Sequence, residues 1–165
     1  MMKRTKQTAI GTLAALATVV ASISSAHAVT FVSPFSDARN FAGTDWQWWN
    51  PNVVTAAIPA GGRLVKVTFS AESACYGAGG WCSVRVVYRQ VGSDTINEFG
   101  PVVAEDFAFD SSDSNNESSG SWESHAISRS AFLPAGNYQI WVQARTTASN
   151  LTLRLDDAHL EVEYE

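Results

Sequence analysis

Polar and apolar positions alternate along most of the chain after residue 28. In VKVTFSAES (65–73), apolar residues occupy every second position, and the same alternation recurs in SVRVVYRQV (83–91) and NYQIWVQAR (137–145). It continues through NLTLRLDDAHLEVEYE (150–165) and is weaker in SWESHAISRSAF (121–132). Successive side chains of a strand point to opposite faces, so each segment predicts a strand with one buried face. A long amphipathic helix is absent from the pattern, which therefore predicts an all-β antiparallel sandwich.

Turn residues and one change of phase divide these strands. Because proline fixes φ and glycine adopts positive φ, IPAGG (58–62) and LPAG (133–136) predict two similar corners of a two-sheet fold. The alternation of the last segment shifts phase at residues 156–158, which predicts a bulge or a tight turn. DSSDSNNESSGS (110–121) is polar and without a period, so it predicts a loop. Pro101 argues against a central strand position in the extended run before that loop.

The first 28 residues predict a secretory signal peptide. A basic start is followed by an apolar run (9–23) and by the small-x-small site Ala26-His27-Ala28. The run is short for a membrane span, which needs about 20 residues, and no later segment is long enough. We expect cleavage after Ala28 and a single domain over 29–165, that is 165 − 28 = 137 residues. The expected location is secreted, either extracellular or periplasmic.

The composition of the predicted domain is acidic. Removing the three basic residues of the signal leaves 11 − 3 = 8 basic against 16 acidic residues, a formal charge of −8. An acidic chain without a basic patch repels phosphate backbones, so nucleic acid is not an expected partner. The charge favours solubility outside the cell and names no partner by itself.

Two cysteines, Cys75 and Cys82, bracket the segment YGAGGW. In an exported chain this spacing favours a disulfide over a redox pair or half of a metal site, because it is not C-x-x-C and no second pair completes a zinc set. The glycines between the cysteines suit a turn. We therefore expect a hairpin of the strands 65–73 and 83–91 that is clamped at its tip by the disulfide.

The sequence resembles a family of small proteins at this point. The VKVTFSAES strand, the cysteine-bridged turn, LPAGNYQIWVQAR and the terminal LEVEYE resemble small exported bacterial β-sandwich proteins. Their jelly-roll form is similar to carbohydrate-binding modules and to C1q/tumour-necrosis-factor-like domains. The resemblance covers about residues 53–165 and includes no diagnostic functional motif. It implies a jelly-roll sandwich and says little about function.

Aromatic residues are the main candidates for ligand binding. In GTDWQWWNPN (43–52), a strand would place Trp46 and Trp48 on one face and Trp49 on the other. Exposed rings could stack on sugars; alternatively, Trp46 and Trp48 pack into the core and Trp49 covers an edge. Tyr76 and Trp81, within the cysteine loop, could act as rigid contact residues; alternatively, Trp81 folds back over the disulfide.

A weak calcium candidate lies in the acidic loop. Asp113, Asn115 and Glu117 supply the alternating oxygen ligands that open a calcium loop. Ser118 stands where such a loop needs glycine, and no glutamate follows at the twelfth position. The other interpretation is a solvated loop, and no other cofactor is expected.

Catalytic candidates are incomplete. Glu123 with His125 and Asp157 with His159 each have the two-residue spacing of an orienter and a base on one strand face. A G-x-S-x-G nucleophile motif is absent, and glycoside hydrolysis needs two carboxylates that sequence alone does not pair. We therefore expect no enzymatic activity.

These patterns together favour a secreted, non-catalytic binding module. The expected partner is a carbohydrate or a cell-surface polymer, contacted by Trp46, Trp48, Tyr76 and Trp81. The first alternative is a self-associating structural subunit of an extracellular assembly. The second is a small secreted hydrolase.

Overall fold

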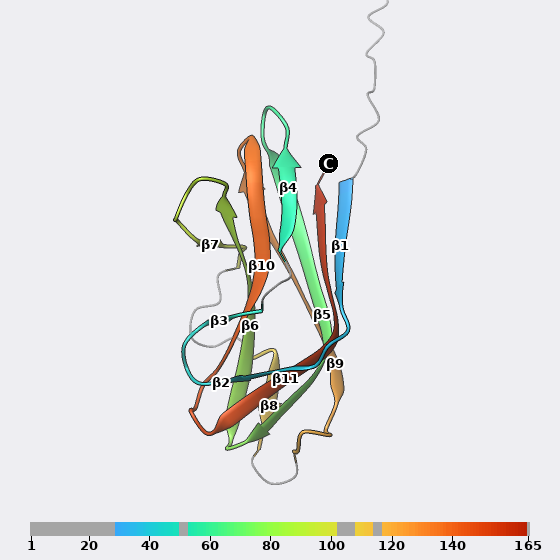
Figure 1. Cartoon of the computed structure of the whole chain (residues 1–165), viewed down its shortest axis with the longest axis vertical. Helices are drawn as coiled ribbons and strands as arrows, with labels where there is room; N and C mark the ends of the chain where they lie inside the picture. Colours follow the sequence, from blue (N-terminus) through green and yellow to red (C-terminus); the bar gives the residue numbers. More distant parts are fainter. Residues whose placement is uncertain (1–28, 50–52, 102–107, 114–116, 165) are drawn as a thin grey trace, which may run out of the picture.

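Two antiparallel sheets form the protein in the computed structural model, which describes residues 29–49, 53–101, 108–113 and 117–164 (Figure 1). Sheet A consists of β1 (Val29–Phe35), β2 (Arg39–Ala42), β5 (Arg63–Gly77), β9 (Glu123–Leu133) and β11 (Leu151–Tyr164). Sheet B consists of β3 (Gln47–Trp48), β4 (Val54–Ile58), β6 (Gly80–Gln90), β7 (Asn97–Glu98), β8 (Asp110–Ser112) and β10 (Gly136–Thr146). The described residues contain no helix, and hence none that is long and apolar enough to cross a membrane.

The strand order is that of a jelly roll. β1 and β2 pair with successive parts of β11, β3 and β4 with successive parts of β10, and β7 and β8 with different parts of β6. If each such couple counts as one strand, sheet A has the order 1-8-3-6 and sheet B the order 2-7-4-5. That order describes a double-sheet jelly roll. The predicted all-β jelly-roll sandwich is confirmed.

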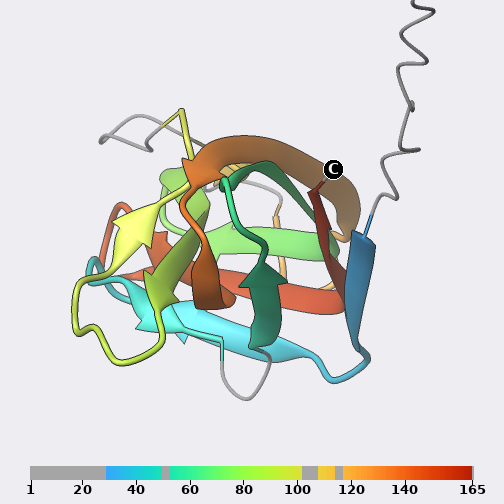
Figure 2. The ribbon, with the colours of Figure 1, turned by 90° about the horizontal axis from the view of Figure 1, so that it is seen from above.

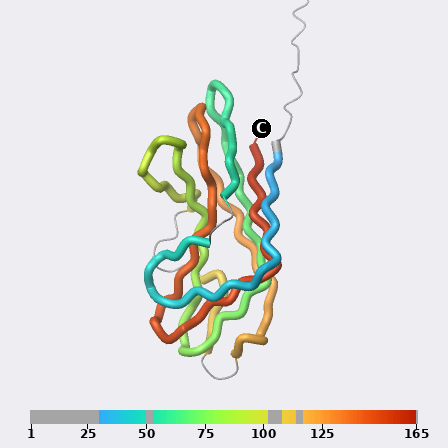
Figure 3. Tube along the Cα trace, viewed as in Figure 1, coloured from blue at the N-terminus to red at the C-terminus, as the bar shows by residue number. Residues whose placement is uncertain are grey.

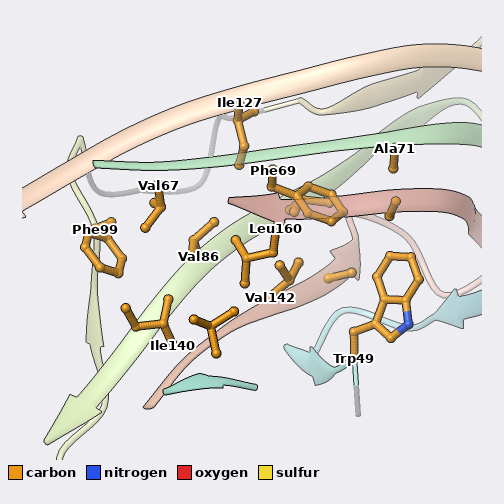
Figure 4. Packing of buried hydrophobic residues seen from close by; sticks show 14 of the residues in the cluster. Trp49, Val67, Phe69, Ala71, Val86, Phe99, Ile127, Ile140, Val142 and Leu160 are labelled. Atoms are coloured by element: carbon orange, nitrogen blue, oxygen red, sulfur yellow. The ribbon is translucent and has the colours of Figure 1, made fainter. Parts of the chain in front are cut away.

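The core lies between the two inner faces. Alternating residues of β5 and β11 face those of β6 and β10, and Figure 4 shows Phe69, Leu160 and Ile140 in the interior between the strands. Burying each large apolar side chain contributes about 1.5–3 kcal/mol, so the alternation that predicts the strands also supplies the stability of the fold. Figure 2 shows the strands of both sheets enclosing this interior.

The predicted bulge in the last strand is present. The register of β11 against β5 shifts between Asp156 and His159, and Asp157 has a positive φ of 42°. Leu155 and Ala158 therefore both face the core although they are three residues apart. The bulge also marks the change of partner, because β11 pairs with β2 before it and with β1 after it. Figure 3 shows β1 running beside the end of β11.

Both predicted corners connect one sheet to the other. The first joins β4 of sheet B to β5 of sheet A, and the second joins β9 of sheet A to β10 of sheet B. Gly62 has a φ of +71°, and a Cβ on it would lie 2.8 Å from the carbonyl oxygen of Leu133. The corners are neighbours in space, since Ile58 pairs with Gly136.

Two local predictions are wrong. The segment around the cysteines is not a hairpin within one sheet, because β5 belongs to sheet A and β6 to sheet B. The Cys75–Cys82 disulfide is present and links the two sheets, with the Cα atoms 6.0 Å apart. The acidic stretch is not all loop, because β8 pairs with residues 80–82 of β6. Asp110 and Ser112 of β8 face inward, so this strand lacks the apolar inner positions that reveal the others.

Two other predictions lie beyond the described residues. The expected signal peptide and its cleavage site fall in residues 1–28. The extended run after Pro101 falls mostly in 102–107.

Candidate functional site

The outer face of sheet B carries an unusual set of side chains. Alternation on β6 and β10, with the register of β3, directs tryptophans, arginines and glutamines away from the core. We call this set the outer face of sheet B; it comprises Trp46, Trp48, Arg85, Arg89, Gln139, Trp141, Gln143 and Arg145. Strand register places Trp48, Gln143 and Arg85 in one row across three strands.

Trp48 is the most exposed ring of this face. Its side chain is 41% exposed and packs edge-on against Trp141, with the ring centroids 5.1 Å apart. Trp141 is buried beneath it, and the indole Nε1 of Trp141 has no hydrogen-bond partner among the described residues. The guanidinium of Arg89 lies 5.8 Å from the Trp141 ring centroid. Trp48 is thus supported from below while its outer surface meets solvent.

Trp46 is held between two arginines. The Arg85 guanidinium lies 4.2 Å from the ring centroid and that of Arg145 lies 4.6 Å from it, both within cation–π range. Arg85 is fixed in turn, because its Nη1 is 3.2 Å from Glu98 Oε2 and its Nε donates to Gln143 Oε1 at 2.8 Å. Burial lowers the pKa of Arg85, and the charge of Glu98 opposes that shift. These contacts hold the Trp46 ring in one position.

The third tryptophan of the cluster lies in the core. Trp49 is 3% exposed and packs against Phe35, Phe41 and Phe69 at centroid distances of 5.0, 5.7 and 6.0 Å. As expected for a strand, Trp49 therefore points to the opposite face from Trp46 and Trp48, and it is Trp49 that is buried. The alternative in which Trp46 and Trp48 fill the core does not hold.

The two aromatics of the cysteine loop do not form one surface. Tyr76 is on the outer side of sheet A, where it pairs with Thr152 of β11. Trp81 is 38% exposed on the outer side of sheet B, and Thr147 holds its backbone through hydrogen bonds of 3.0–3.1 Å. Trp81 therefore does not join Tyr76 in a common platform at the loop tip.

The charge distribution differs from the sequence-based expectation. Three of the eight basic residues of the predicted domain, Arg85, Arg89 and Arg145, lie together on the outer face of sheet B. Of the acidic residues, Glu98 is paired with Arg85. The expectation that the domain has no basic patch is thus wrong for this face, because residues far apart in the sequence meet only through the register of β6 and β10.

A second cluster is polar and lies between the two sheets, on the inner sides of β5, β8 and β9. The Ser73 hydroxyl donates to Asp110 Oδ2 at 2.7 Å and is 2.8 Å from His125 Nδ1. His125 Nε2 is 3.5 Å from Glu123 Oε2. The sequence singles out Glu123 and His125 and places Asp110 in the acidic loop, but its spacing does not group Asp110 or Ser73 with the histidine. Ser73 does carry a signal, because it is a polar residue at an inward position of β5, in phase with Phe69 and Ala71.

This cluster does not have the arrangement of a serine hydrolase. Ser73 is fully buried, and its hydroxyl hydrogen is donated to Asp110 rather than to a base. A nucleophile must reach substrate and transfer its proton to a base. The other predicted dyad consists of Asp157 and His159, and both residues are exposed to solvent. His159 lies on the outer face of sheet A, in a surface depression of about 410 Å³ that Ser70 and Glu161 also line.

The calcium candidates are only partly described. Glu117 Oε2 accepts hydrogen bonds from the Asp113 backbone N–H at 3.3 Å and from the Ser112 hydroxyl at 3.4 Å. Asn115 lies outside the described residues. Glu117 therefore bonds back to the end of β8 and to the residue after it.

Comparisons with known proteins give no family. No protein-family model and no curated protein matches the chain. Among solved structures, the VP2 subviral particle of infectious bursal disease virus matches 84% of this chain and 33% of its own, with 9% identity and a TM-score of 0.41. Eiger TNF from S. frugiperda matches 81% of this chain and 94% of its own, with 13% identity and a TM-score of 0.32. For latent PorU from Porphyromonas gingivalis, the match covers 84% of this chain and 13% of the PorU chain, with 14% identity and a TM-score of 0.34.

The chain spans about 33% of the VP2 chain, the first of these structures. At this level of identity and TM-score, the likenesses define neither a family nor a function. Function is therefore argued from the side chains alone.

Proposed function

We propose that the protein is a secreted, non-catalytic module that binds glycans through the outer face of sheet B. The observation that carries the proposal is the exposed Trp48 ring on its Trp141 support, beside a Trp46 ring clamped by two arginines. Rings held in place lose little side-chain entropy on binding, so they are effective contact residues. The apolar C–H face of a sugar stacks on such rings.

Hydrogen-bond donors surround the two rings. The Nε atoms of Arg85 and Arg89 are engaged by glutamines, whereas Arg145 Nε is buried without a partner among the described residues. Because Arg85 and Arg145 lie over Trp46 and Arg89 lies over Trp141, we expect glycans with carboxylate or sulfate groups to bind more tightly than neutral ones.

Binding is tested with the processed protein on an array of neutral and acidic polysaccharides, followed by titration of the best ligand. Trp48→Ala is expected to weaken binding at least about tenfold, which corresponds to about 1.4 kcal/mol, and to leave the fold intact. Trp81→Ala is a matched control, because Trp81 has similar exposure outside the set of clamped rings. Equal affinity of the wild-type and Trp48→Ala proteins would refute the proposal.

Self-association is a second candidate function, and a different surface favours it. Leu64 and Phe132 are directly paired across β5 and β9 on the outer face of sheet A, and they are 64% and 61% exposed. A cross-strand apolar pair of this exposure is a contact candidate, because burying it between two copies of the chain removes apolar area from water.

The mass in solution tests this second candidate. At about 100 µM, light scattering should report a dimer or trimer, and Phe132→Ser should shift it to the monomer without lowering the melting temperature, since Phe132 lies outside the core. A wild-type protein that stays monomeric at this concentration would rule the second candidate out.

A further inference from the structure

The inner polar cluster between the two sheets has the donor set of a metal site. Asp110, Glu123 and His125 each place a ligand atom within 4.8 Å of those of the other two. They come from two strands, since Asp110 belongs to β8 and the other two to β9. We propose that these three side chains bind a divalent transition-metal ion, with Zn²⁺ as the natural probe. This site is separate from the outer face of sheet B.

The hydrogen bonds select the histidine tautomer that binds metal. A carboxylate only accepts, so the single hydrogen of the Ser73 hydroxyl goes to Asp110, at 2.7 Å. The Ser73 oxygen is then the acceptor for His125, and Nδ1 must carry the hydrogen at that 2.8 Å contact. In the neutral imidazole this leaves Nε2 with its lone pair free. A ring N–H held by a hydrogen-bond acceptor, here the Ser73 hydroxyl, is the support that metal-bound histidines use.

The distance on the other side of the ring fits a shared ion. His125 Nε2 is 3.5 Å from Glu123 Oε2, which is long for a charge-assisted hydrogen bond. Two ligands of one tetrahedral ion, with bonds of 2.0–2.2 Å, are about 3.4 Å apart. The present separation therefore leaves room for an ion between the two atoms without moving the ring.

Two carboxylates in one cluster also attract a cation. The carboxylates of Asp110 and Glu123 have oxygens within 4.8 Å of each other, and Asp110 is buried. A cation bound between the two like charges would lower the electrostatic energy of the pair. Because the Glu123 side chain is 70% exposed, it can rotate to close on an ion and leaves the site open to entry from solvent. One imidazole nitrogen and two carboxylate oxygens suit zinc better than calcium, which prefers oxygen alone.

Zinc binding is measured with the processed chain after chelator treatment and desalting. Titration calorimetry and native mass spectrometry should show one Zn²⁺ per chain, and saturating Zn²⁺ should raise the melting temperature by about 5–10 °C. Ca²⁺ at the same concentration should give no rise. Glu123→Gln and His125→Gln should each weaken zinc binding at least about tenfold.

The chain supplies a matched control pair. His159 and Glu161 have the same two-residue spacing, with both side chains on the outer face of sheet A. His159→Gln and Glu161→Gln should leave zinc affinity unchanged, and circular dichroism should show all four apo variants folded. Absence of bound zinc at micromolar concentration, or an equal loss in the His159→Gln variant, would overturn the proposal.

Discussion

Replacing Trp49 by alanine is expected to lower the free energy of unfolding by about 3–5 kcal/mol, the range for deleting a large aromatic ring from a packed core. The ring lies among Phe35, Phe41 and Phe69. Its backbone N–H also donates to the carbonyl of Val142 in β10. Because the ring bridges residues of β1, β2 and β5, the surrounding side chains come from several strands and cannot collapse together into the space it leaves.

Urea unfolding followed by circular dichroism measures this loss. Trp48→Ala is the control one residue away, and it should lose less than half as much because its ring is partly in solvent. A Trp49→Ala protein as stable as Trp48→Ala would show that the core is not placed as described.

Replacing both Cys75 and Cys82 by alanine is expected to cost about 2.5 kcal/mol, the loop-entropy value for a ring this small. Both sulfur atoms lie in the core, so alanine leaves no buried polar group behind. The loss of stability should be greatest at the end of the sandwich where the disulfide joins the two sheets, beside β8.

Guanidinium unfolding of the double variant, with and without a reducing agent, gives the measurement. The reducing agent should lower the unfolding midpoint of the wild-type protein and leave that of the double variant unchanged. Intact mass after alkylation of the native wild-type protein should show no modified cysteine. A reactive thiol there would contradict the disulfide.

Which residues face inward was largely predictable from the sequence. Alternation gave the faces of β5, β6, β10 and β11, and the phase shift gave the bulge at Asp157. Two Pro-Ala-Gly segments gave the corners between the sheets. Each of these features depends on neighbours along the chain, and the period of a strand records them directly.

Which strand lies beside which was not predictable in the same way. The alternation on either side of the Cys75–Cys82 segment is the same for a hairpin and for a crossing between sheets. In the tryptophan cluster, period 2 separated Trp49 from Trp46 and Trp48 without indicating which side is buried. Arg85 and Arg145 share a face only through the register of β6 on β10, which turn geometry and packing set.

Polar residues at inward positions were the hardest to assign. Ser73 and Asp110 break the apolar pattern of an inner face, and in sequence such a break resembles a loop. Ser73 stays in phase with the buried face of β5, but its connection to Asp110 and His125 is seen only in the structure. A polar residue that stays in phase with a buried face is a signal to examine in similar chains.

The central claim, that Trp46 and Trp48 form the glycan-contacting surface, is tested most directly by oxidative footprinting of the tryptophans with mass spectrometry, with and without bound polysaccharide. Without ligand, Trp48 and Trp81 should react readily, while Trp49 and Trp141 should stay unmodified because they are buried. With ligand, we predict protection of Trp48 and Trp46 and unchanged reaction of Trp81. Protection of Trp81 with Trp48 still reactive would contradict the account.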